Sequence, residues 1–231
     1  MAEEANSGAA AGRMTGPTAV LFDMDGTLLD SEPLWDTALR DLAERLGGVL
    51  SDWARQAMIG RNARDSMAIF YRDLGLAGQD RRGDHAWVVD RMAQLFATDL
   101  TWQPGAAELV AQVRAAGIPT ALVTSTHRRL VEVALRTLLG RETFDAVVCG
   151  NEVTAPKPHP ESYLTAAERL GVPIGRCVAI EDSPAGVASA QAAGAVVVGV
   201  RGEVALPVVG GVELVGSLAE VDLDWLIRLI S

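Results

Sequence analysis

The chain has 231 residues, 49% of them hydrophobic, and a formal net charge of −10. This length allows one large domain or a domain with a sizeable insertion. The negative charge argues against a general nucleic-acid or anionic-membrane binder, which needs clustered lysine and arginine. The only two cysteines, Cys149 and Cys177, predict no disulfide framework or zinc cluster, and both lie in apolar runs typical of buried, inert thiols.

The first 18 residues mix small and charged residues and lack the apolar segment of a signal peptide. We expect residues 1–18 to be a disordered leader, with Met14 as an alternative start of the chain. No uninterrupted apolar stretch reaches the length of a membrane span. The sequence therefore predicts a soluble, cytoplasmic protein.

The first predicted strand is the apolar run Ala19–Phe22, which leads directly into the sequence DMDGT. Asp23 and Asp25 are separated by one residue, and in an extended segment residues i and i+2 point the same way. Two like charges can share one site beside a cation, and Mg²⁺ is the natural candidate because it prefers oxygen ligands. Gly26 lets the chain turn tightly after the two aspartates, where main-chain N–H groups can bind an anion.

Residues 30–100 show only helical periodicity, for example in the spacing of Leu39, Leu42 and Leu46. We therefore expect an all-helical insertion there, entered through Leu29–Asp30 and left through Leu100–Gly105. Because the insertion directly follows the strand with the two aspartates, we expect it to cover them as a lid that closes about these linkers.

From residue 101 onward, short Val-rich strands alternate with helices that end at glycine. The predicted strands are 118–123, 146–149, 177–180 and 195–200, and the predicted helices are 105–116, 127–139, 160–170 and 184–193. This alternation is typical of a parallel sheet covered by helices on both faces, an α/β fold. With the first strand added, the expected core comprises residues 19–29 and 101–231.

Polar residues follow four of the predicted strands. These clusters are Asp23 with Asp25, Thr124 with Ser125 and Thr126, Lys157, and Glu181 with Asp182. Ligands of open α/β sheets bind at the carboxyl ends of the strands. Parallel topology would therefore deliver all four clusters to one edge of the sheet.

The clusters resemble, in order and spacing, the motifs of the haloacid dehalogenase superfamily. DMDGT is similar to the first motif, LVTST to the second, KPHPESY to the third and IEDSPAGVASA to the fourth. The resemblance covers essentially everything after residue 18 and is to the phosphatase branch with a helical cap. It implies a Rossmann-like, doubly wound parallel sheet with an inserted helical cap, and an enzyme that hydrolyses phosphate monoesters.

The resemblance also implies roles for individual residues. Asp23 would attack phosphorus to form an aspartyl-phosphate, and Asp25 would act as general acid and then as general base. Thr124 would bind the transferring phosphoryl group, and Lys157 would neutralise its oxygens. The implied metal is Mg²⁺, with Asp23, the main-chain carbonyl of Asp25 and Asp182 as ligands and Glu181 helping directly or through water. The implied substrate contacts are Gly26, Thr27, Ser125, Thr126, Glu32, Arg61 and Arg64.

The stretch DSEPLW, residues 30–35, resembles bacterial hexose- and hexitol-phosphate phosphatases, which favours a small sugar or polyol phosphate. Substrate choice is expected to reside in the insertion, at Glu32, Trp35 and the loop with Arg61, Asn62 and Arg64. An arginine there would contact sugar hydroxyls or a second phosphate.

Taken singly, several of these residues have simpler interpretations. Thr124–Thr126 can cap the helix predicted from residue 127, and Lys157 can be a solvated loop residue. Glu181 and Asp182 can mark the start of a helix, where acidic side chains suit the helix dipole. The isolated His85, His127 and His159 are expected to be structural or surface residues.

Other reactions of the same scaffold are separated by single residues. The resemblance argues against dehalogenation because Asp25 is present, and against phosphonate cleavage because Lys157 is the only lysine in the chain. A sugar phosphomutase stays open, weakened because Trp35 stands where such mutases carry a histidine. A non-catalytic phosphate-sensing module is the other alternative. The expected partner is a small phosphorylated metabolite, with no nucleic acid and no membrane, for a monomer or weak homodimer.

Overall fold

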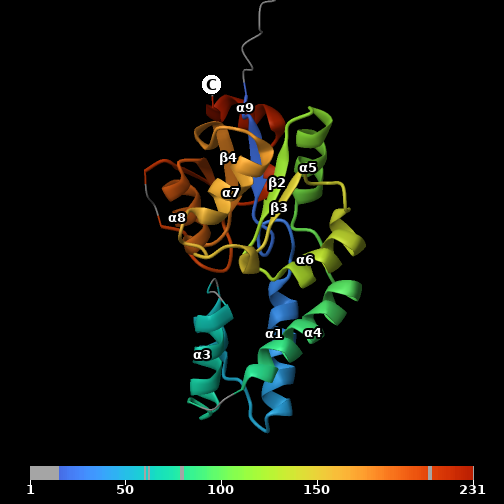
Figure 1. The fold of residues 1–231 in the computed structure, drawn as a ribbon, viewed down its shortest axis with the longest axis vertical. Helices are drawn as coiled ribbons and strands as arrows, with labels where there is room; N and C mark the ends of the chain where they lie inside the picture. Colours follow the sequence, from blue (N-terminus) through green and yellow to red (C-terminus); the bar gives the residue numbers. More distant parts are fainter. Residues whose placement is uncertain (1–15, 60, 62, 79–80, 208–209, 231) are drawn as a thin grey trace, which may run out of the picture.

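The computed structural model describes residues 16–59, 61, 63–78, 81–207 and 210–230. Figure 1 shows a sheet surrounded by helices and, at one end of it, a smaller group of helices. Most of the expected leader, including Met14, lies outside the described residues. At the start of the described part, the Thr18 N–H donates to the main-chain oxygen of Arg176 over 2.9 Å.

The described strands form one parallel sheet in the order β3-β2-β1-β4-β5-β6. They are β1 (Ala19–Phe22), β2 (Thr120–Val123), β3 (Ala146–Val148), β4 (Cys177–Glu181), β5 (Val196–Val200) and β6 (Val212–Val215). The chain runs outward from β1 through β2 to β3 and then crosses to β4 on the other side of β1. The strand order therefore reverses between β1 and β4, where open α/β sheets bind ligands. The predicted α/β fold is confirmed.

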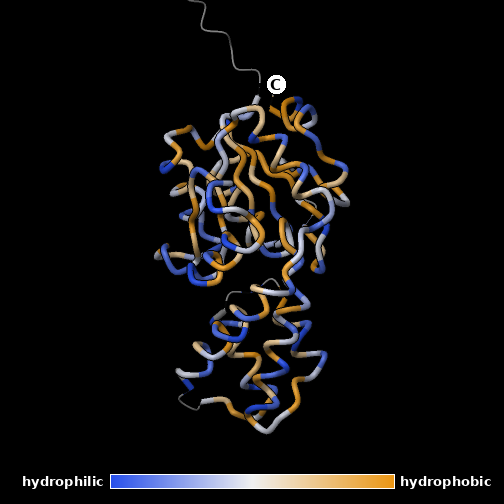
Figure 2. The backbone as a smooth tube through the Cα atoms, turned by 90° about the vertical axis from the view of Figure 1, so that its right-hand side faces the viewer, coloured by the Kyte–Doolittle hydropathy of each residue, from blue (hydrophilic) through white to orange (hydrophobic). Residues whose placement is uncertain are grey.

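Helices cover both faces of the sheet. On one face, Val20 and Phe22 share a hydrophobic cluster with α5 (Ala106–Ala115), α6 (Arg128–Ala134) and α9 (Leu223–Ile230). On the other face, Ala19 and Leu21 pack with α7 (Glu161–Leu170) and α8 (Pro184–Ala193). Because both faces are covered, the inner strands of the sheet are mostly apolar, as the hydrophobic tube at the centre of the upper part of Figure 2 shows.

Short turns of helix complete the described part of the core. A π-helical turn, η1 (Leu135–Leu139), follows α6, where the sequence predicts one continuous helix. The 3₁₀ turns are η2 (Gly150–Glu152), η3 (Ile174–Arg176) and η4 (Leu218–Glu220). Among the described residues, no helix is both long and apolar enough to cross a membrane.

Two elements of the core, β6 and α9, are absent from the sequence prediction. Strand β6 has four residues and lies at the edge of the sheet, where Glu213 and Leu214 are exposed. A strand exposed in this way lacks the continuous apolar run that marks the buried strands. Helix α9 has eight residues, too few for its strong amphipathic pattern to stand out from a short apolar run.

The smaller group of helices, called the cap from here on, is built from residues between β1 and α5. Its helices are α1 (Glu32–Arg45), α2 (Asp52–Met58), α3 (Ala63–Asp73) and α4 (Arg82–Thr98). Helix α2 begins at the N-cap Ser51, whose hydroxyl accepts a hydrogen bond from the Ala54 N–H. The Ser51 hydroxyl also donates to Asp73 of α3 over 2.7 Å, which ties these two helices together.

The two chain segments between cap and core are hydrogen-bonded to each other. Leu29 and Trp102 form an antiparallel bridge, and the Asp30 N–H donates to the Thr101 carbonyl over 3.0 Å. A second bond of 2.8 Å runs from the Gln103 N–H to the Leu28 carbonyl. The cap thus enters and leaves the core through one short paired ribbon.

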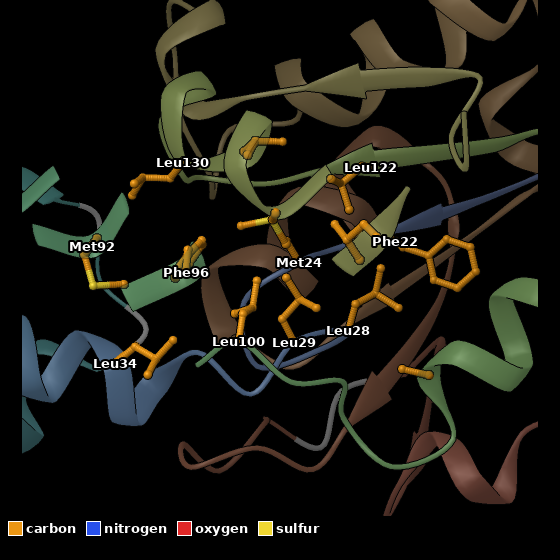
Figure 3. Packing of buried hydrophobic residues seen from close by; sticks show 14 of the residues in the cluster. Phe22, Met24, Leu28, Leu29, Leu34, Met92, Phe96, Leu100, Leu122 and Leu130 are labelled. Atoms are coloured by element: carbon orange, nitrogen blue, oxygen red, sulfur yellow. The ribbon is translucent and has the colours of Figure 1, made fainter. Parts of the chain in front are cut away.

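Apolar side chains continue from the sheet into the cap. Figure 3 shows Leu130 of α6 beside Phe96 and Met92 of α4, while Leu28 and Leu29 lie between them and Phe22 of β1. Arg129 of α6 also forms an ion pair with Asp90 of α4. Helix α4 is therefore the part of the cap that is packed against the core.

Truncation of Phe96 tests this packing. The Phe96 side chain is 1% exposed, so Phe96→Ala is expected to lower the free energy of unfolding by about 3–5 kcal/mol through lost burial and a residual cavity. Trp53, a cap aromatic that is 67% exposed, is the matched control, and Trp53→Ala is expected to cost about 0.5 kcal/mol or less. Urea unfolding measures both values. Equal costs would contradict the packing of α4 on the core.

Candidate active site

A cavity of about 970 Å³ lies between the carboxyl ends of the strands and the cap. Its lining includes nearly all of the site residues that the sequence predicts, whereas Glu181 lies behind it, fully buried. From the core these are Asp23, Asp25, Gly26, Thr27, Thr124, Ser125, Thr126, Lys157 and Asp182, and from the cap Glu32, Trp35, Arg61 and Arg64. The fold therefore gathers residues that are far apart in the sequence.

Lys157 links the ends of three strands. Its ammonium group donates to Asp23 Oδ1 over 2.6 Å, to Glu181 Oε1 over 2.5 Å and to the main-chain carbonyl of Val123 over 2.9 Å. An ammonium group has three N–H donors, so all of them are used. Lys157 is 7% exposed, which rules out the interpretation as a solvated loop residue.

The pKa directions follow from this buried cluster. Burial and the neighbouring Glu181 raise the pKa of Asp23 well above its ordinary value, although Lys157 opposes them. Burial disfavours the charge of Lys157, but the carboxylates of Asp23 and Glu181 outweigh it and raise the pKa of that ammonium group. Burial, with Glu181 beside it, raises the pKa of Asp182 to about 8. The carboxyl groups of Asp23, Glu181 and Asp182 thus surround a single cation, the Lys157 ammonium group.

The residues present fit a hard divalent cation. Oxygen atoms of Asp23, Glu181 and Asp182 all lie within 4.8 Å of one another. Carboxylates are ligands that Mg²⁺ takes up in proteins, and a second positive charge would oppose the burial and the repulsion by Glu181 that raise the pKa of Asp23 and of Asp182. Glu181 is the member least free to bind a metal, because its Oε1 accepts from both Lys157 and the Tyr163 hydroxyl.

Thr27 and Gly26 fit around Asp182. The fully buried hydroxyl of Thr27 donates to Asp182 Oδ1 over 3.1 Å. We expected Thr27 to contact substrate, and its side-chain hydroxyl is instead bonded to an acidic residue of the site. Gly26 has a φ of +80°, and a Cβ atom there would overlap the Asp182 carboxylate. Any larger residue at position 26 would displace Asp182.

Asp25 lies in a different environment from Asp23. Its Oδ1 accepts from the Ser31 hydroxyl over 2.6 Å and lies 3.5 Å from the indole nitrogen of Trp35. Its Oδ2 accepts from the hydroxyls of Thr126 over 2.7 Å and Thr124 over 3.3 Å. Neutral donors from the cap and from the core thus surround this carboxylate, with no ion pair among the described residues.

One of the simpler interpretations is wrong and another is confirmed. Helix α6 is capped by His127, whose Nδ1 accepts from the Arg129 N–H, and not by residues 124–126. Glu181 and Asp182 do lie directly before a helix, α8, whose N-cap Ser183 accepts from the Gly186 N–H over 3.0 Å. The hydroxyls of Thr124 and Thr126 are bonded to Asp25 and not to the first turn of α6.

The remaining histidines and cysteines have the expected environments. His159 Nδ1 accepts from the Glu161 N–H, while His85 and His127 line the cavity without a metal-ligand group around them in the described chain. Cys149 and Cys177 are free and buried, and burial raises the pKa of the Cys149 thiol to about 12.

The cap contributes a buried ion pair to the cavity. Arg55 of α2, which the sequence analysis missed, donates through Nη2 to Glu32 Oε2 over 2.6 Å and to the Glu32 carbonyl over 3.2 Å. Its Nε lies 3.2 Å from Asp36 Oδ1. Burial raises the pKa of Glu32, and the bond to Arg55 opposes that shift. Both Glu32 and Arg55 line the cavity.

The exposed cap arginines are less constrained. Arg61 donates through Nε to the Ala57 carbonyl over 2.7 Å, so part of its guanidinium caps the end of α2. Arg64 lines the cavity from the first turn of α3. Asn62 lies outside the described residues.

Two further residues of the core were missed by sequence reasoning. Tyr163 of α7 donates its hydroxyl to Glu181 Oε1 over 2.6 Å. Gly186 of α8 leaves room for the Glu181 carboxylate, which a Cβ atom there would overlap. Both residues belong to stretches that the sequence analysis had quoted, KPHPESY and IEDSPAGVASA, but their partners are visible only in the fold.

Comparisons with known proteins give one family. Residues 17–194 match the haloacid dehalogenase-like hydrolases. The chain is 35% identical over 176 residues to the "Phosphorylated carbohydrates phosphatase" of Thermotoga maritima, covering 76% of this chain and 81% of that protein. It is 33% identical over 178 residues to hexitol phosphatase B of Escherichia coli K12, covering 76% and 79%. The structure of CbbY from Rhodobacter sphaeroides with phosphate aligns with a TM-score of 0.79 and 30% identity, covering 88% of this chain and 96% of that one.

Substitution of Gly186 tests the packing around Glu181. Both Gly186 and Gly83 lie in the first turn of a helix, α8 and α4 respectively, where alanine is ordinarily neutral or slightly stabilising. Because its Cβ would overlap Glu181, Gly186→Ala is expected to lower the free energy of unfolding by about 1–3 kcal/mol. Gly83→Ala meets nothing within 4 Å and is expected to cost nothing. Urea unfolding of both variants measures these changes in the free energy of unfolding. A neutral Gly186→Ala would refute the described position of Glu181.

Proposed function

The chain belongs to the haloacid dehalogenase-like hydrolases and is a phosphatase of that family, and we propose that it hydrolyses a small sugar or polyol phosphate with Mg²⁺ through an aspartyl-phosphate on Asp23. One observation carries the proposal. Lys157 is bonded to Asp23 over 2.6 Å at the edge of a cavity, beside a group of acidic oxygens, while Asp25 stands apart among neutral donors. This arrangement separates a nucleophile from an acid–base residue.

Asp23, Asp182 and the main-chain carbonyl of Asp25 are the proposed ligands of Mg²⁺. When bound, the ion neutralises negative charge on the phosphoryl group and on the two carboxylates. We assign Glu181 a supporting role behind them, because it is fully buried and bonded to Lys157 and Tyr163.

The proposed reaction has two steps, both at phosphorus. In the first step, a carboxylate oxygen of Asp23 forms a bond to phosphorus, the bond from phosphorus to the leaving oxygen breaks, and Asp25 donates its proton to that oxygen. In the second step, Asp25 takes a proton from water, the water oxygen bonds to phosphorus, and the Asp23–phosphorus bond breaks. Lys157 offsets charge on the phosphoryl oxygens in both steps.

The hydrogen-bond donors around Asp25, the proposed acid–base residue, come from both the cap and the core, so movement of the cap would change its hydrogen bonds. Ser31 and Trp35 lie at the start of α1, just after the paired ribbon that joins cap and core, whereas Thr124 and Thr126 belong to the core. Closure of the cap about its linkers would therefore change which donors Asp25 keeps. We propose that closure excludes water and sets Asp25 for proton transfer.

The cap side of the cavity supports a polyhydroxylated substrate. Glu32 Oε1 accepts no hydrogen bond from the described residues, while Arg55 occupies Oε2. A carboxylate oxygen held in this way can accept a bond from a substrate hydroxyl. The names of the relatives, which refer to phosphorylated carbohydrates and hexitols, agree with this substrate class.

Phosphate release tests the proposed reaction. With sugar, polyol, nucleotide and glycolate phosphates as a panel, we expect release that requires Mg²⁺, stops with EDTA and is lost in Asp23→Asn, because the amide cannot attack phosphorus. Sugar or polyol phosphates should rank first. Absence of release, together with phosphorylation of Asp23 by a sugar bisphosphate, would instead identify a mutase. Phosphate binding without any turnover would identify a sensor.

Glu32→Gln tests the substrate class. We expect the ratio of kcat/KM for a hexitol phosphate to that for phenyl phosphate, which has no hydroxyls, to fall about tenfold, through a weaker hydrogen bond. Asp36→Asn is the control, because Asp36 also pairs with Arg55 but does not line the cavity. An unchanged ratio in Glu32→Gln would remove Glu32 from substrate recognition.

A further inference from the structure

Tyr163 is a buried aromatic residue next to the catalytic lysine. It lies in the first turns of α7 and is fully buried, and its hydroxyl donates to Glu181 Oε1 over 2.6 Å. The Lys157 ammonium nitrogen lies 5.1 Å from the centre of its ring. Burial, with Glu181 beside it, raises the pKa of the Tyr163 hydroxyl, so the group is a stable donor.

One oxygen atom connects the tyrosine and the lysine. Glu181 Oε1 accepts from Tyr163 over 2.6 Å and from Lys157 over 2.5 Å. The other oxygen, Oε2, accepts from the Ser183 hydroxyl over 3.1 Å. Gly186 packs so closely against the carboxylate that a Cβ atom at this position would overlap it. Glu181 therefore has little freedom to turn. Loss of one of the two donors to Oε1 would change the hydrogen bond that the other donor forms with the same oxygen.

Two carboxylates compete for the Lys157 ammonium group. It lies 2.6 Å from Asp23 Oδ1 and 2.5 Å from Glu181 Oε1. A buried carboxylate needs donors to offset the cost of its lost hydration. Tyr163 supplies one such donor to Glu181 without adding charge. If the hydroxyl is removed, Oε1 keeps only Lys157, and Glu181 attracts the ammonium group more strongly at the expense of Asp23.

We propose that Tyr163 is a positioning residue: its hydrogen bond to Glu181 keeps the Lys157 ammonium group shared with Asp23, the nucleophile. The inference rests on the proposed function, because it assigns Tyr163 a role in the attack of Asp23 on phosphorus. Tyr163 does not line the cavity, and its effect would reach Asp23 through Glu181 and Lys157.

Tyr163→Phe is the direct test, because it keeps the ring and removes only the hydroxyl. The chain has two tyrosines, and Tyr71 is the matched control. The Tyr71 hydroxyl also donates to a carboxylate, Asp84, over 3.3 Å, but it lies in the cap and does not line the cavity. We expect kcat to fall about tenfold in Tyr163→Phe with KM within about twofold, as for one lost hydrogen bond to a charged group, and both to be unchanged in Tyr71→Phe.

A spectroscopic readout is available because Lys157 is the only lysine in the chain. Protein labelled with lysine carrying ¹⁵N at Nζ gives one side-chain ammonium signal, which reports the surroundings of Lys157 in the resting enzyme. We expect this signal to move in Tyr163→Phe and to stay in place in Tyr71→Phe.

The outcomes separate this inference from the proposed function. If the unmodified enzyme releases no phosphate, the proposed function fails, while the ammonium signal still reports on the contact. If the unmodified enzyme is active, two results overturn the inference: a kcat in Tyr163→Phe within twofold of that in Tyr71→Phe, or a loss of kcat with the Lys157 signal unmoved. A rise of KM equal to the fall of kcat would also overturn it, because a general disturbance of the cavity would then explain the change.

Discussion

Lys157 donates to Asp23 over 2.6 Å and to Glu181 over 2.5 Å, where Glu181 is fully buried and Asp23 is only 7% exposed. Without that cation, the ends of β1 and β4, which are paired side by side, would bring two unbalanced negative charges together. Leaving a buried charge without its partner costs about 3–5 kcal/mol. Because the lysine comes from the loop before α7, the interaction joins three separate parts of the chain at one point. The site and the stability of this edge of the sheet therefore depend on the same contact.

The two aspartates that begin the site are kept in different electrostatic environments. Asp23 is bonded to a cation and lies within the acidic group, whereas Asp25 is surrounded by hydroxyl and indole donors. Lys157 favours the charged form of Asp23, the proposed nucleophile, against the burial and the neighbouring Glu181 that raise its pKa. The donors around Asp25 come from both the cap and the core. Two positions separated by one residue can therefore take the two proposed roles, because different neighbours surround them.

The sheet and most of the site could be predicted because the information is local. Each predicted strand is a short apolar run, and Asp23, Thr124 and Asp182 lie directly after one, so parallel topology alone places these three at one edge. Tyr163 and Arg55 could not be found in this way. Tyr163 is bonded to Glu181 and Arg55 to Glu32, and only the packing of the fold brings these partners together. Thr27 was placed at the site by its motif, but the direction of its hydroxyl toward Asp182 is a property of the fold.

The missed residues share a physical role that motifs do not encode. Tyr163 and Gly186 shape the surroundings of Glu181, the first by a hydrogen bond and the second by the absence of a side chain. In the cap, Arg55 shapes the surroundings of Glu32 by a hydrogen bond. In each case the missed residue holds a carboxylate of the site, either Glu181 behind the cavity or Glu32 on its wall. A buried carboxylate needs hydrogen-bond donors to offset its lost hydration, and these residues help to supply them or make room for them. The search for functional residues in this fold therefore extends one contact beyond the cavity wall.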